Sequence, residues 1–521
     1  MKSLSGSFAC KRGISASIFI VVFCLSLESI AQTWQSSLLS IDSSGKLVYH
    51  ADSMGNKLPD FSGVGYTATK MDESYTRSNP AIYAGFSGTD YYGRDATDHL
   101  QSLIDEVSRR KPTKTGLRGI IYLSDTVYYI DSSLRISASG IILRGTNNKT
   151  VFVARGTGRR TLVEVSGTGS PVEVKKTRTW ITDAYVLVGS KQINVANASE
   201  FRKGDQVMLF RPGTRQWIHD LRMDSIAPAD AATRQWQAGE CDLEFQRVVV
   251  AVKGNTITLD QPVVMAIDSA YGGGCIYKYR FPGRITQVGI ENIHFRSEYK
   301  SDTDEDHAWS AVSFNRIDQG WVKNSTATYF ALSAVHLKSL ATHITVDSCR
   351  SFAPKSKITG GRRYAFTIDG QLNLVKNCFS SEGRHDYVTG ARVCGPNVFY
   401  NCRAERAFAD TGPHHRWAVG TLYDNITTDG EINAQDRGNW GTGHGWSGVS
   451  QVFWNCKALR AAIQDPWVSG RNYVIGMAAK PYPGRLPGRN ASVWETGNHG
   501  GLRPVSLYQA QLLQSRGLIS P

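Results

Sequence analysis

The sequence predicts an all-β fold, a solenoid of stacked parallel coils, and three observations lead to this prediction. Glycine is frequent, with 50 residues among 521, and only 20% of residues are charged, which favours turns and short strands over long helices. One short motif recurs along the second half of the chain. A single segment near the N-terminus has clear helical periodicity.

The recurring motif places a polar residue, usually asparagine, directly after a short apolar strand. Its copies have this residue at positions 292, 324, 348, 377, 401, 425 and 455, where position 348 is serine and the others are asparagine. The successive steps are 32, 24, 29, 24, 24 and 30 residues. The repeated step of 24 indicates the length of one coil, and the longer steps indicate loops inserted into a coil.

Parallel stacking brings equivalent residues of successive coils to about 4.8 Å from one another. We therefore expect the repeated asparagines to form a ladder of side-chain amide hydrogen bonds at a tight corner. In the last five copies the next residue is small or apolar: Cys349, Cys378, Cys402, Ile426 and Cys456. We expect these residues to stack inside the coils, with the thiols reduced. A disulfide or metal framework is the alternative.

The first of five predicted parts, residues 1–31, is a signal peptide. Three basic residues precede an apolar run at 18–25, and Ala31 offers a cleavage site. This run is too short to span a membrane, so we expect a secreted or periplasmic protein with no membrane span. Removing the segment lowers the formal net charge from +14 to +12 and leaves seven of nine cysteines. Of these, Cys241 and Cys275 could form a disulfide.

The second part, residues 32–164, is predicted to hold an irregular lead-in, a capping helix and the first coils. The helix should run from Asp95 to Arg110, because Leu100, Leu103, Ile104 and Val107 fall on one face. Short strands are expected afterwards at 119–123, 127–130, 134–136 and 141–145.

The remaining three parts are an insertion, the main solenoid and a tail. Residues 165–280 break the rhythm of the coils and predict a separate β-rich insertion. Its residues Trp217, His219 and Trp236 could reach a ligand, but we expect them to be local core. Residues 281–476 form the main solenoid with the long loops. Residues 477–521 are an extended tail with a short final helix at 506–516, which either caps the solenoid or packs on its side.

The opening pattern GIIYLSDTVYYI…LRI…GIILRG resembles the first coils of pectate-lyase-like right-handed parallel β-helix proteins. The segment GRHDYV…GPNVFYNCRAE…GPHHRWAVGTLYDN…GTGHGW…VFWNCKA is similar to exported bacterial members regarded as polysaccharide lyases. The resemblance covers the chain from about Gly93 onward, apart from the insertion. It implies right-handed coils and a ligand site on their outer face. The dense Asp cluster of a calcium site is absent from the sequence, so we expect no cofactor, although calcium remains an alternative.

Four of the twelve histidines fall between Gly383 and Trp446, with arginines and tryptophans in glycine-rich turns beside them. Such a cluster suits a charged, ring-shaped ligand. A basic exported protein is further expected to meet an acidic polysaccharide rather than nucleic acid.

These residue types suit β-elimination on a uronic acid chain, which needs a carboxylate neutraliser, a base and an acid. The candidate neutralisers are Arg384, Arg416 and Asn439. The candidate bases are His385, His414, His415 and His444, and the candidate acids are Tyr387 and Tyr423. The residues expected to bind substrate are Trp417, Arg437, Asn439, Trp440 and Trp446.

Two other functions compete with the lyase. A glycoside hydrolase or glycan transferase needs paired carboxylates, for which the candidates are Asp386, Asp410, Asp424, Asp436 and Asp465. A non-catalytic glycan-binding surface protein needs only tryptophan and arginine. The sequence leaves the oligomeric state, the polysaccharide and the identity of the base open.

Overall fold

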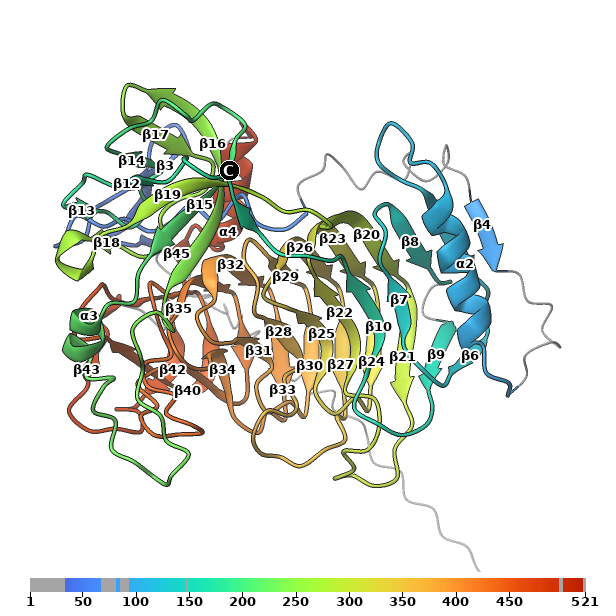
Figure 1. Cartoon of the computed structure of the whole chain (residues 1–521). Helices are drawn as coiled ribbons and strands as arrows, with labels where there is room; N and C mark the ends of the chain where they lie inside the picture. The colour runs from blue at the N-terminus through green and yellow to red at the C-terminus, as the bar shows by residue number, and fades with distance from the viewer. Residues whose placement is uncertain (1–32, 67–80, 85–92, 147–148, 496–499, 519–521) are drawn as a thin grey trace, which may run out of the picture. The chain divides into compact units, whose positions relative to one another are not determined.

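Successive coils of the chain form a right-handed parallel β-helix, as the sequence predicts (Figure 1). The computed structural model describes residues 33–66, 81–84, 93–146, 149–495 and 500–518. The predicted signal peptide at 1–31 lies outside these ranges. The described residues belong to one unit of the chain.

Each regular coil supplies one strand to each of three parallel ladders, here called ladders A, B and C. Ladder A is the 13-stranded sheet, with β4 (Ala81–Ala84), β5 (Gly119–Leu123), β8 (Ile141–Arg144), β20 (Ile285–Glu291), β23 (Ile317–Lys323), β26 (Ala341–Asp347), β29 (Leu374–Lys376), β32 (Cys394–Tyr400), β35 (Ala418–Asp424), β38 (Gly448–Val449), β39 (Val452–Trp454), β41 (Tyr473–Ile475) and β44 (Trp494–Glu495).

Ladders B and C join through one long strand, β40 (Lys457–Asp465), into a 19-stranded sheet. Ladder B contains β6 (Val127–Ile130), β9 (Thr150–Ala154), β21 (Ile293–Ser297), β24 (Thr326–Thr328), β27 (Arg350–Phe352), β30 (Phe379–Ser381), β33 (Arg403–Glu405), β36 (Thr427–Thr428) and β42 (Ala478–Pro481). Ladder C contains β7 (Leu134–Ile136), β10 (Thr161–Ser166), β22 (Ser310–Asn315), β25 (Ser333–Leu337), β28 (Phe366–Ile368), β31 (Tyr387–Thr389), β34 (Asp410–Pro413) and β37 (Glu431–Ala434). A short strand, β43 (Asn490–Ala491), pairs antiparallel with β40.

The repeated asparagines form the corner between ladders A and B. Each takes a left-handed backbone conformation, for example φ 54° at Asn377 and 51° at Asn401, which asparagine tolerates better than most residues. The amide of Asn401 donates to Asn377 at 2.8 Å, and that of Asn455 donates to Asn425 at 2.8 Å. The predicted ladder is therefore formed only in part within the described residues, because the Asn377 amide donates to Asp347 and the Asn425 amide donates to Asp424 and Val505.

The cysteines after this corner are buried and unpaired, which confirms the prediction for Cys349, Cys378, Cys402 and Cys456. They belong to one interior core that also stacks the rings of Phe399, Tyr423 and Phe453, with neighbouring centroids 5.3 and 5.0 Å apart.

The suggested disulfide between Cys241 and Cys275 is wrong, since both thiols are free. The two residues lie in different hydrophobic clusters of the insertion. The Cys275 thiol accepts a hydrogen bond from Arg178 at 3.0 Å.

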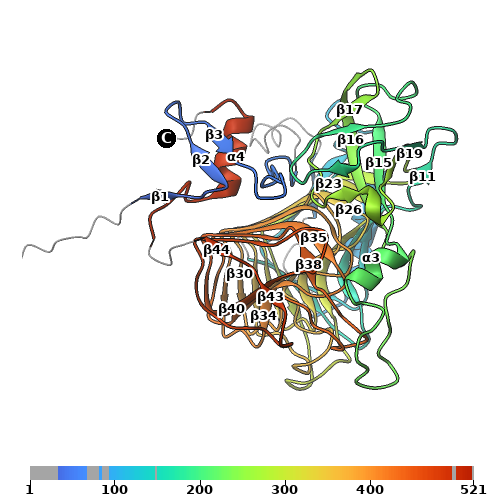
Figure 2. The ribbon, with the colours of Figure 1, turned by 90° about the vertical axis from the view of Figure 1, so that its left-hand side faces the viewer.

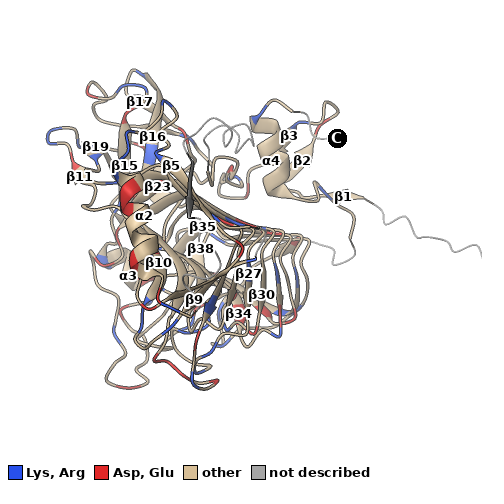
Figure 3. Cartoon of the chain, turned by 90° about the vertical axis from the view of Figure 1, so that its right-hand side faces the viewer, with Lys and Arg blue, Asp and Glu red and all other residues tan. Residues whose placement is uncertain are grey.

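A helix covers the first coils, as predicted (Figure 3). This helix, α2 (Thr97–Arg109), buries Leu100, Ile104 and Val107 in the interior core. Asp95 accepts hydrogen bonds from the backbone and hydroxyl of Thr97 at its start.

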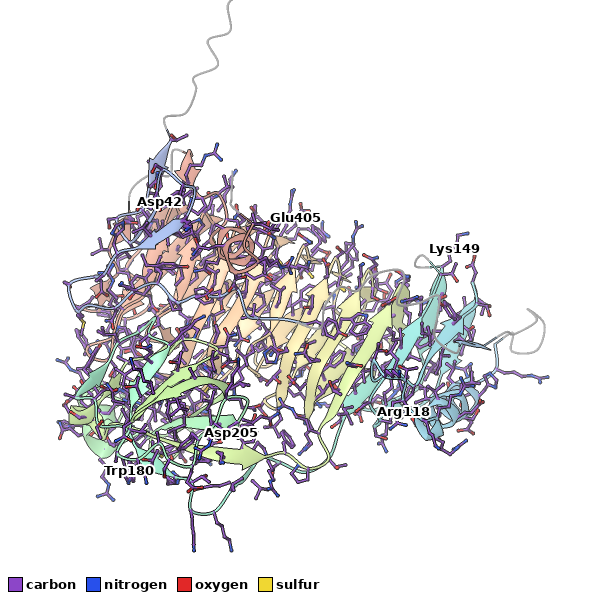
Figure 4. The ribbon with its side chains drawn as sticks, turned by 90° about the horizontal axis from the view of Figure 1, so that it is seen from above. Asp42, Arg118, Lys149, Trp180, Asp205 and Glu405 are labelled. Carbon is purple, nitrogen blue, oxygen red and sulfur yellow. The ribbon has the colours of Figure 1, made fainter. Side chains whose placement is uncertain are left out.

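The insertion is a mainly antiparallel sheet beside the coils of β32 and β35 (Figures 1 and 4). Its elements are β11 (Val172–Glu173), β12 (Thr179–Trp180), β13 (Tyr185–Val186), β14 (Gln192–Asn194), β15 (Gln206–Arg211), α3 (Arg215–Asp220), β16 (Leu243–Lys253), β17 (Thr256–Leu259), β18 (Ile267–Asp268), a 3₁₀ turn at Ser269–Tyr271 and β19 (Cys275–Arg280). Trp180 and Asp205 lie on it, away from Glu405 of β33 (Figure 4). Trp217 and Trp236 are buried in its core, as predicted, whereas the prediction is wrong for His219, which is exposed.

The first and last described segments meet on the outer face of ladder A (Figure 2). There the hairpin of β2 (Leu39–Ile41) and β3 (Leu47–Tyr49) packs with the final helix α4 (Leu507–Ser515), and β1 (Trp34–Gln35) pairs with β45 (Leu502–Arg503). The final helix therefore packs on the side of the solenoid. The Asp424 carboxylate accepts hydrogen bonds from the Ser506 hydroxyl and the Tyr508 amide at 2.7 Å. Within the described ranges, no helix is long and apolar enough to cross a membrane.

Candidate functional site

The four clustered histidines converge on ladder C from three successive coils. The ring centroids of His385 and His414 are 4.4 Å apart, and His414 lies 5.1 Å from His415 and 5.0 Å from His444. His415 and His444 are separated by 4.9 Å. The convergence that the sequence analysis could only assume is therefore present, and we call these four side chains the imidazole cluster.

Local backbone contacts position each imidazole. His385 precedes β31, and its backbone amide donates to Arg363 O at 3.1 Å. His414 follows β34 and donates to Thr389 O at 2.9 Å. His444 lies in the loop after β37, where Gly441 has φ +56° and a Cβ would approach the His444 ring to 2.1 Å. Only glycine fits that turn without displacing the imidazole.

A tyrosine that the sequence analysis missed belongs to this cluster. The Tyr364 hydroxyl is hydrogen-bonded to His414 Nε2 at 3.0 Å, and its ring lies 4.8 Å from that of His385. The register of β28 and β31 pairs Phe366 with Tyr387, which sets Tyr364 beside His385. Tyr364 occupies the position of His385 in the preceding coil, but it lies outside the histidine-rich stretch between Gly383 and Trp446.

Three charged residues surround the cluster. Arg384 Nη1 donates to Gly360 O and lies 3.5 Å from the Tyr364 hydroxyl. The buried carboxylate of Asp410 forms an ion pair with the buried guanidinium of Arg437. His385 Nδ1 donates to Asp410 O at 2.9 Å, so in the neutral ring its Nε2 carries the lone pair.

Burial keeps the imidazoles neutral. It lowers the pKa of His385 to about 4 despite the nearby Asp410 carboxylate. Burial, followed by Arg416, lowers the pKa of His415 to about 4, and burial, followed by His415, lowers that of His444 to about 3. The pKa of His414 also falls well below its usual value. At neutral pH the cluster therefore offers lone pairs and N–H groups but little positive charge.

Several of these polar atoms are buried without a partner. His385 Nε2, His414 Nδ1, His415 Nδ1 and His444 Nδ1 make no hydrogen bond. Buried polar groups are usually hydrogen-bonded, so a group of orphaned nitrogens is typical of a site that awaits a ligand. His385 and His414 are buried, whereas His415, His444 and Tyr364 are half-buried and form its accessible part.

Two tryptophans expected to stack on sugar rings lie elsewhere. Trp417 and Trp446 are completely buried. Trp417 packs edge-on against Trp217 at 5.0 Å, and the Trp446 indole donates to Leu221 O at 3.2 Å. Both rings join the β-helix to the insertion, so neither is available to a ligand.

The two tyrosines proposed as acids lie in the interior of the coils and not at the imidazole cluster. Tyr423 is completely buried, between Phe399 and Phe453 in the interior. Tyr387 is equally buried, and its hydroxyl donates to the carbonyls of Cys378 and Arg403. Side chains alternate between the two faces of a strand, and a shift of one position moves a residue from the outer face to the core.

The side chains of most remaining candidates interact with other parts of the protein. Arg416 donates to the carbonyl and hydroxyl of Thr442 at 2.8 Å and so holds the loop of His444. The Asn439 amide donates to Ala227 O at 2.9 Å and accepts from Arg485 at 2.8 Å. Trp440 is exposed, with the Arg485 guanidinium 4.5 Å from its ring centroid.

The carboxylates considered for a hydrolase have structural partners. Asp436 pairs with Arg489 at 2.8 Å, and Asp465 accepts from Asn472 at 2.8 Å. Asp386 accepts from Ser380 at 2.5 Å, and its burial raises its pKa to about 7. Asp424 accepts a hydrogen bond from the Tyr508 amide of α4, and Asp410 forms an ion pair with Arg437. Within the described residues, no group of three or more His, Cys, Asp or Glu side chains is arranged to hold a metal ion.

A pocket of about 610 Å³ lies where the coil corners face the insertion, and none of its lining residues belongs to the imidazole cluster. We call it the junction pocket. It is lined by residues of β15, β16 and β19 and by the coil corners at Asp369 and Arg392. The Arg392 amide donates to Arg416 O at 2.8 Å, so the pocket is adjacent to the turn that carries His415.

No protein-family model and no curated protein matches the chain. Among solved structures, the tailspike protein gp49 from Pseudomonas phage LKA1 is 14% identical, covers 73% of this chain and 69% of its own, and has a TM-score of 0.34. PfbA, a surface adhesin of Streptococcus pneumoniae, is 8% identical over 77% of this chain and 85% of its own, with a TM-score of 0.36. An alginate lyase from Paenibacillus sp. str. FPU-7 is 9% identical over 78% of this chain and 96% of its own, with a TM-score of 0.26. Similarity this low does not establish the pectate-lyase-like family for this chain and carries no functional information.

Proposed function

We propose that the protein is an exported polysaccharide lyase that cleaves a uronic-acid-containing chain by β-elimination at the imidazole cluster. The observation that supports this most directly is the hydrogen bond of 3.0 Å between the half-buried Tyr364 hydroxyl and the neutral His414 imidazole, with the Arg384 guanidinium 3.5 Å from the same hydroxyl. An acid, neutral bases and a fixed cation are thereby gathered within one small region.

In the proposed reaction Arg384 binds the uronate carboxylate. Only its Nη1 is engaged by the protein among the described contacts, so its other donors are free to form the paired hydrogen bonds that arginine makes with carboxylates. The positive charge stabilises the enolate-like charge that develops when the C5 proton leaves.

His415 acts as the base. Its ring is half-buried, and with a pKa of about 4 it is neutral at pH 7. It takes the C5 proton, the electron pair forms the C4=C5 double bond, and the C4–O4 bond breaks. The Tyr364 hydroxyl protonates the departing oxygen, and His414, to which it is bonded, assists its reprotonation.

The glycoside hydrolase is less well supported. Hydrolysis needs two carboxyl groups about 5 to 9.5 Å apart on either side of the bond. Asp410 is the carboxylate within the imidazole cluster, and it is buried in an ion pair with Arg437. A purely binding protein gives no reason for keeping several unpartnered imidazole nitrogens in a buried cluster.

The test is ultraviolet absorbance of the unsaturated uronate. The full mature chain is incubated with alginate, pectate, hyaluronan, chondroitin sulfate, heparin-type chains and ulvan, each with and without chelator. Growth of the absorbance on one of these polymers is the expected result. New reducing ends without absorbance would show a hydrolase, and silence on every polymer would count against an enzyme of this class.

His415→Ala then tests the assignment of the base. Turnover should fall by about 10²–10⁴-fold, the usual contribution of a positioned general base. His219→Ala is the matched control, because His219 is exposed on the insertion and pairs with Asp224. Full activity in His415→Ala would place the base elsewhere.

A further inference from the structure

The charges on the two sides of the imidazole cluster have opposite signs. On the side of Tyr364 lies the Arg384 guanidinium, which forms no salt bridge within the described ranges, whereas Arg437 is neutralised by Asp410. On the side of His415 the junction pocket is lined by four carboxylates and one arginine: Glu173, Asp242, Glu244, Asp369 and Arg392. A long polymer crossing the cluster meets both environments.

Two of the four carboxylates in the junction pocket, Asp242 and Glu244, are not neutralised. Glu173 pairs with Arg178 at 2.5 Å, and Asp369 binds His336 at 2.6 Å. Asp242 accepts only from the Gly213 amide, at 2.8 Å, and Glu244 accepts from the Tyr277 hydroxyl at 3.0 Å. Neither Asp242 nor Glu244 forms a salt bridge within the described ranges. The pocket therefore keeps an excess of negative charge.

The pocket also has the shape and the polar groups of a ligand site. Its volume of about 610 Å³ lies within the range of about 300–1,000 Å³ that is usual for small-molecule sites. Tyr277 and Tyr279 contribute aromatic rings, and Gln246 and Gln371 contribute amides. Phe210 adds an apolar surface.

The junction pocket is adjacent to the turn that carries the proposed base. The backbone amide of its lining residue Arg392 donates at 2.8 Å to the carbonyl of Arg416, the residue that follows His415. Whatever occupies the pocket is therefore close to the site of proton transfer.

We propose that the junction pocket binds the sugar units that adjoin the cleaved uronic acid, and that these units carry neither carboxylate nor sulfate. This inference rests on the proposed lyase function. Its consequence is a substrate class: a heteropolymer in which uronic acid alternates with uncharged or amino sugars. A homopolymer of uronic acid would bring carboxylates against Asp242 and Glu244, which is unfavourable at this proximity.

The test compares two tetrasaccharides by isothermal titration calorimetry at low ionic strength, where Coulomb terms are least screened. One alternates glucuronate with N-acetylglucosamine, and the other is tetragalacturonate. The wild-type chain should bind the alternating probe tighter by about fivefold or more. In the double variant Asp242→Asn, Glu244→Gln, which keeps both hydrogen-bond acceptors, this preference should shrink to about twofold or less.

The matched control removes two charges away from the pocket, in Asp125→Asn, Glu405→Gln, and should keep the wild-type preference. Equal binding of both probes by the wild type, an unchanged preference in the double variant, or no binding of either probe would each overturn the proposal. Absorbance assays on the same probes separate the two ideas. Selective binding without an unsaturated product would refute the lyase but not the pocket.

Discussion

The asparagine corner and the imidazole cluster are both built from residues of successive coils, but they are built differently. At the corner, Asn377 and Asn401 occupy the same position of adjacent coils, share one backbone conformation and bond to each other at 2.8 Å. In the cluster, His385, His414 and His444 come from different positions of their coils and meet through loops of unequal length.

This difference separates two kinds of information in the sequence. A residue that repeats at the coil period serves every coil alike, so it reports on the architecture. A residue that departs from the period serves one place only, and the imidazoles, Tyr364 and Arg384 are of this kind. The following changes test whether the distinction between repeated structural residues and unrepeated site residues holds.

The largest effect is expected from a pair of tyrosine variants. Tyr364→Phe removes the hydroxyl bonded to His414, and turnover should fall by about 10²–10⁴-fold with the melting temperature almost unchanged. Tyr423→Phe changes a residue of the interior stack and should leave turnover at the wild-type level. Steady-state kinetics and thermal unfolding of both proteins decide the matter. Equal activity in the two would remove Tyr364 from the site.

The next effect concerns stability. Trp417 is completely buried and contacts Trp217 across the junction with the insertion. Trp417→Ala should lower the free energy of unfolding by about 3–5 kcal/mol through lost burial and a cavity. Denaturant unfolding measures this loss, with exposed Trp180→Ala as the control. A change below about 1 kcal/mol would contradict the assignment of Trp417 to the core.

The third prediction is that activity persists to lower pH than it would with an ordinary imidazole as the base. His415 must be neutral to act, and its folded pKa of about 4 keeps it so at lower pH than an ordinary imidazole. At pH 5 about 90% of the activity should remain, whereas a pKa of about 6.5 would leave about 3%. Initial rates between pH 4 and 8 give the profile. An acid limb near pH 6.5 would exclude His415 in its present environment as the base.

The same profile needs a control for unfolding. The folded histidine pKa values lie below the unfolded value, so the unfolded chain takes up more protons as pH falls through 6.5, and stability declines. Asp386 and Asp424, with pKa values raised to about 7, act in the opposite direction. Circular dichroism at each pH shows whether a loss of rate reflects unfolding.

The smallest effect is expected at the corner. Asn401→Ala removes one amide bond and leaves a β-carbon at φ 51°, so it should cost about 1 kcal/mol or somewhat more. Asn401→Gly tolerates the backbone and should cost less than Asn401→Ala. Turnover should not change in either variant. Both variants lack the amide, so the reverse order of stability would contradict a strained left-handed backbone at position 401.

The repeat was sufficient to predict the coils, the corner and the unpaired thiols, because these depend on period and side-chain size. The insertion was visible as a break in the period. The grouping of His385, His414, His415 and His444 followed from their closeness in sequence. The face that each side chain takes was not predictable, since Tyr387 and Tyr423 point inward whereas Tyr364, in an irregular stretch before β28, does not.

Charge was the least predictable property of the site. The formal net charge of +14 predicted an acidic polysaccharide as the partner. The junction pocket is nevertheless rich in carboxylates, because residues of the insertion and of the coil corners, far apart in sequence, are brought together there. The net charge of a whole chain does not reveal a pocket whose local charge has the opposite sign.

The loop that carries His444 rests on the insertion. The Trp236 indole donates to Gly443 O at 3.4 Å across 207 residues of chain, and the Arg234 amide donates to Thr442 O at 3.1 Å. During synthesis the insertion therefore emerges long before its partner loop, but its hydrophobic cluster also contains Trp417, Val419 and Trp446 of the coils and is complete only when these residues arrive. The coils then stack neighbour by neighbour until the loop reaches it. The imidazole cluster is thus completed late, at the same stage as the packing of Trp217 against Trp417.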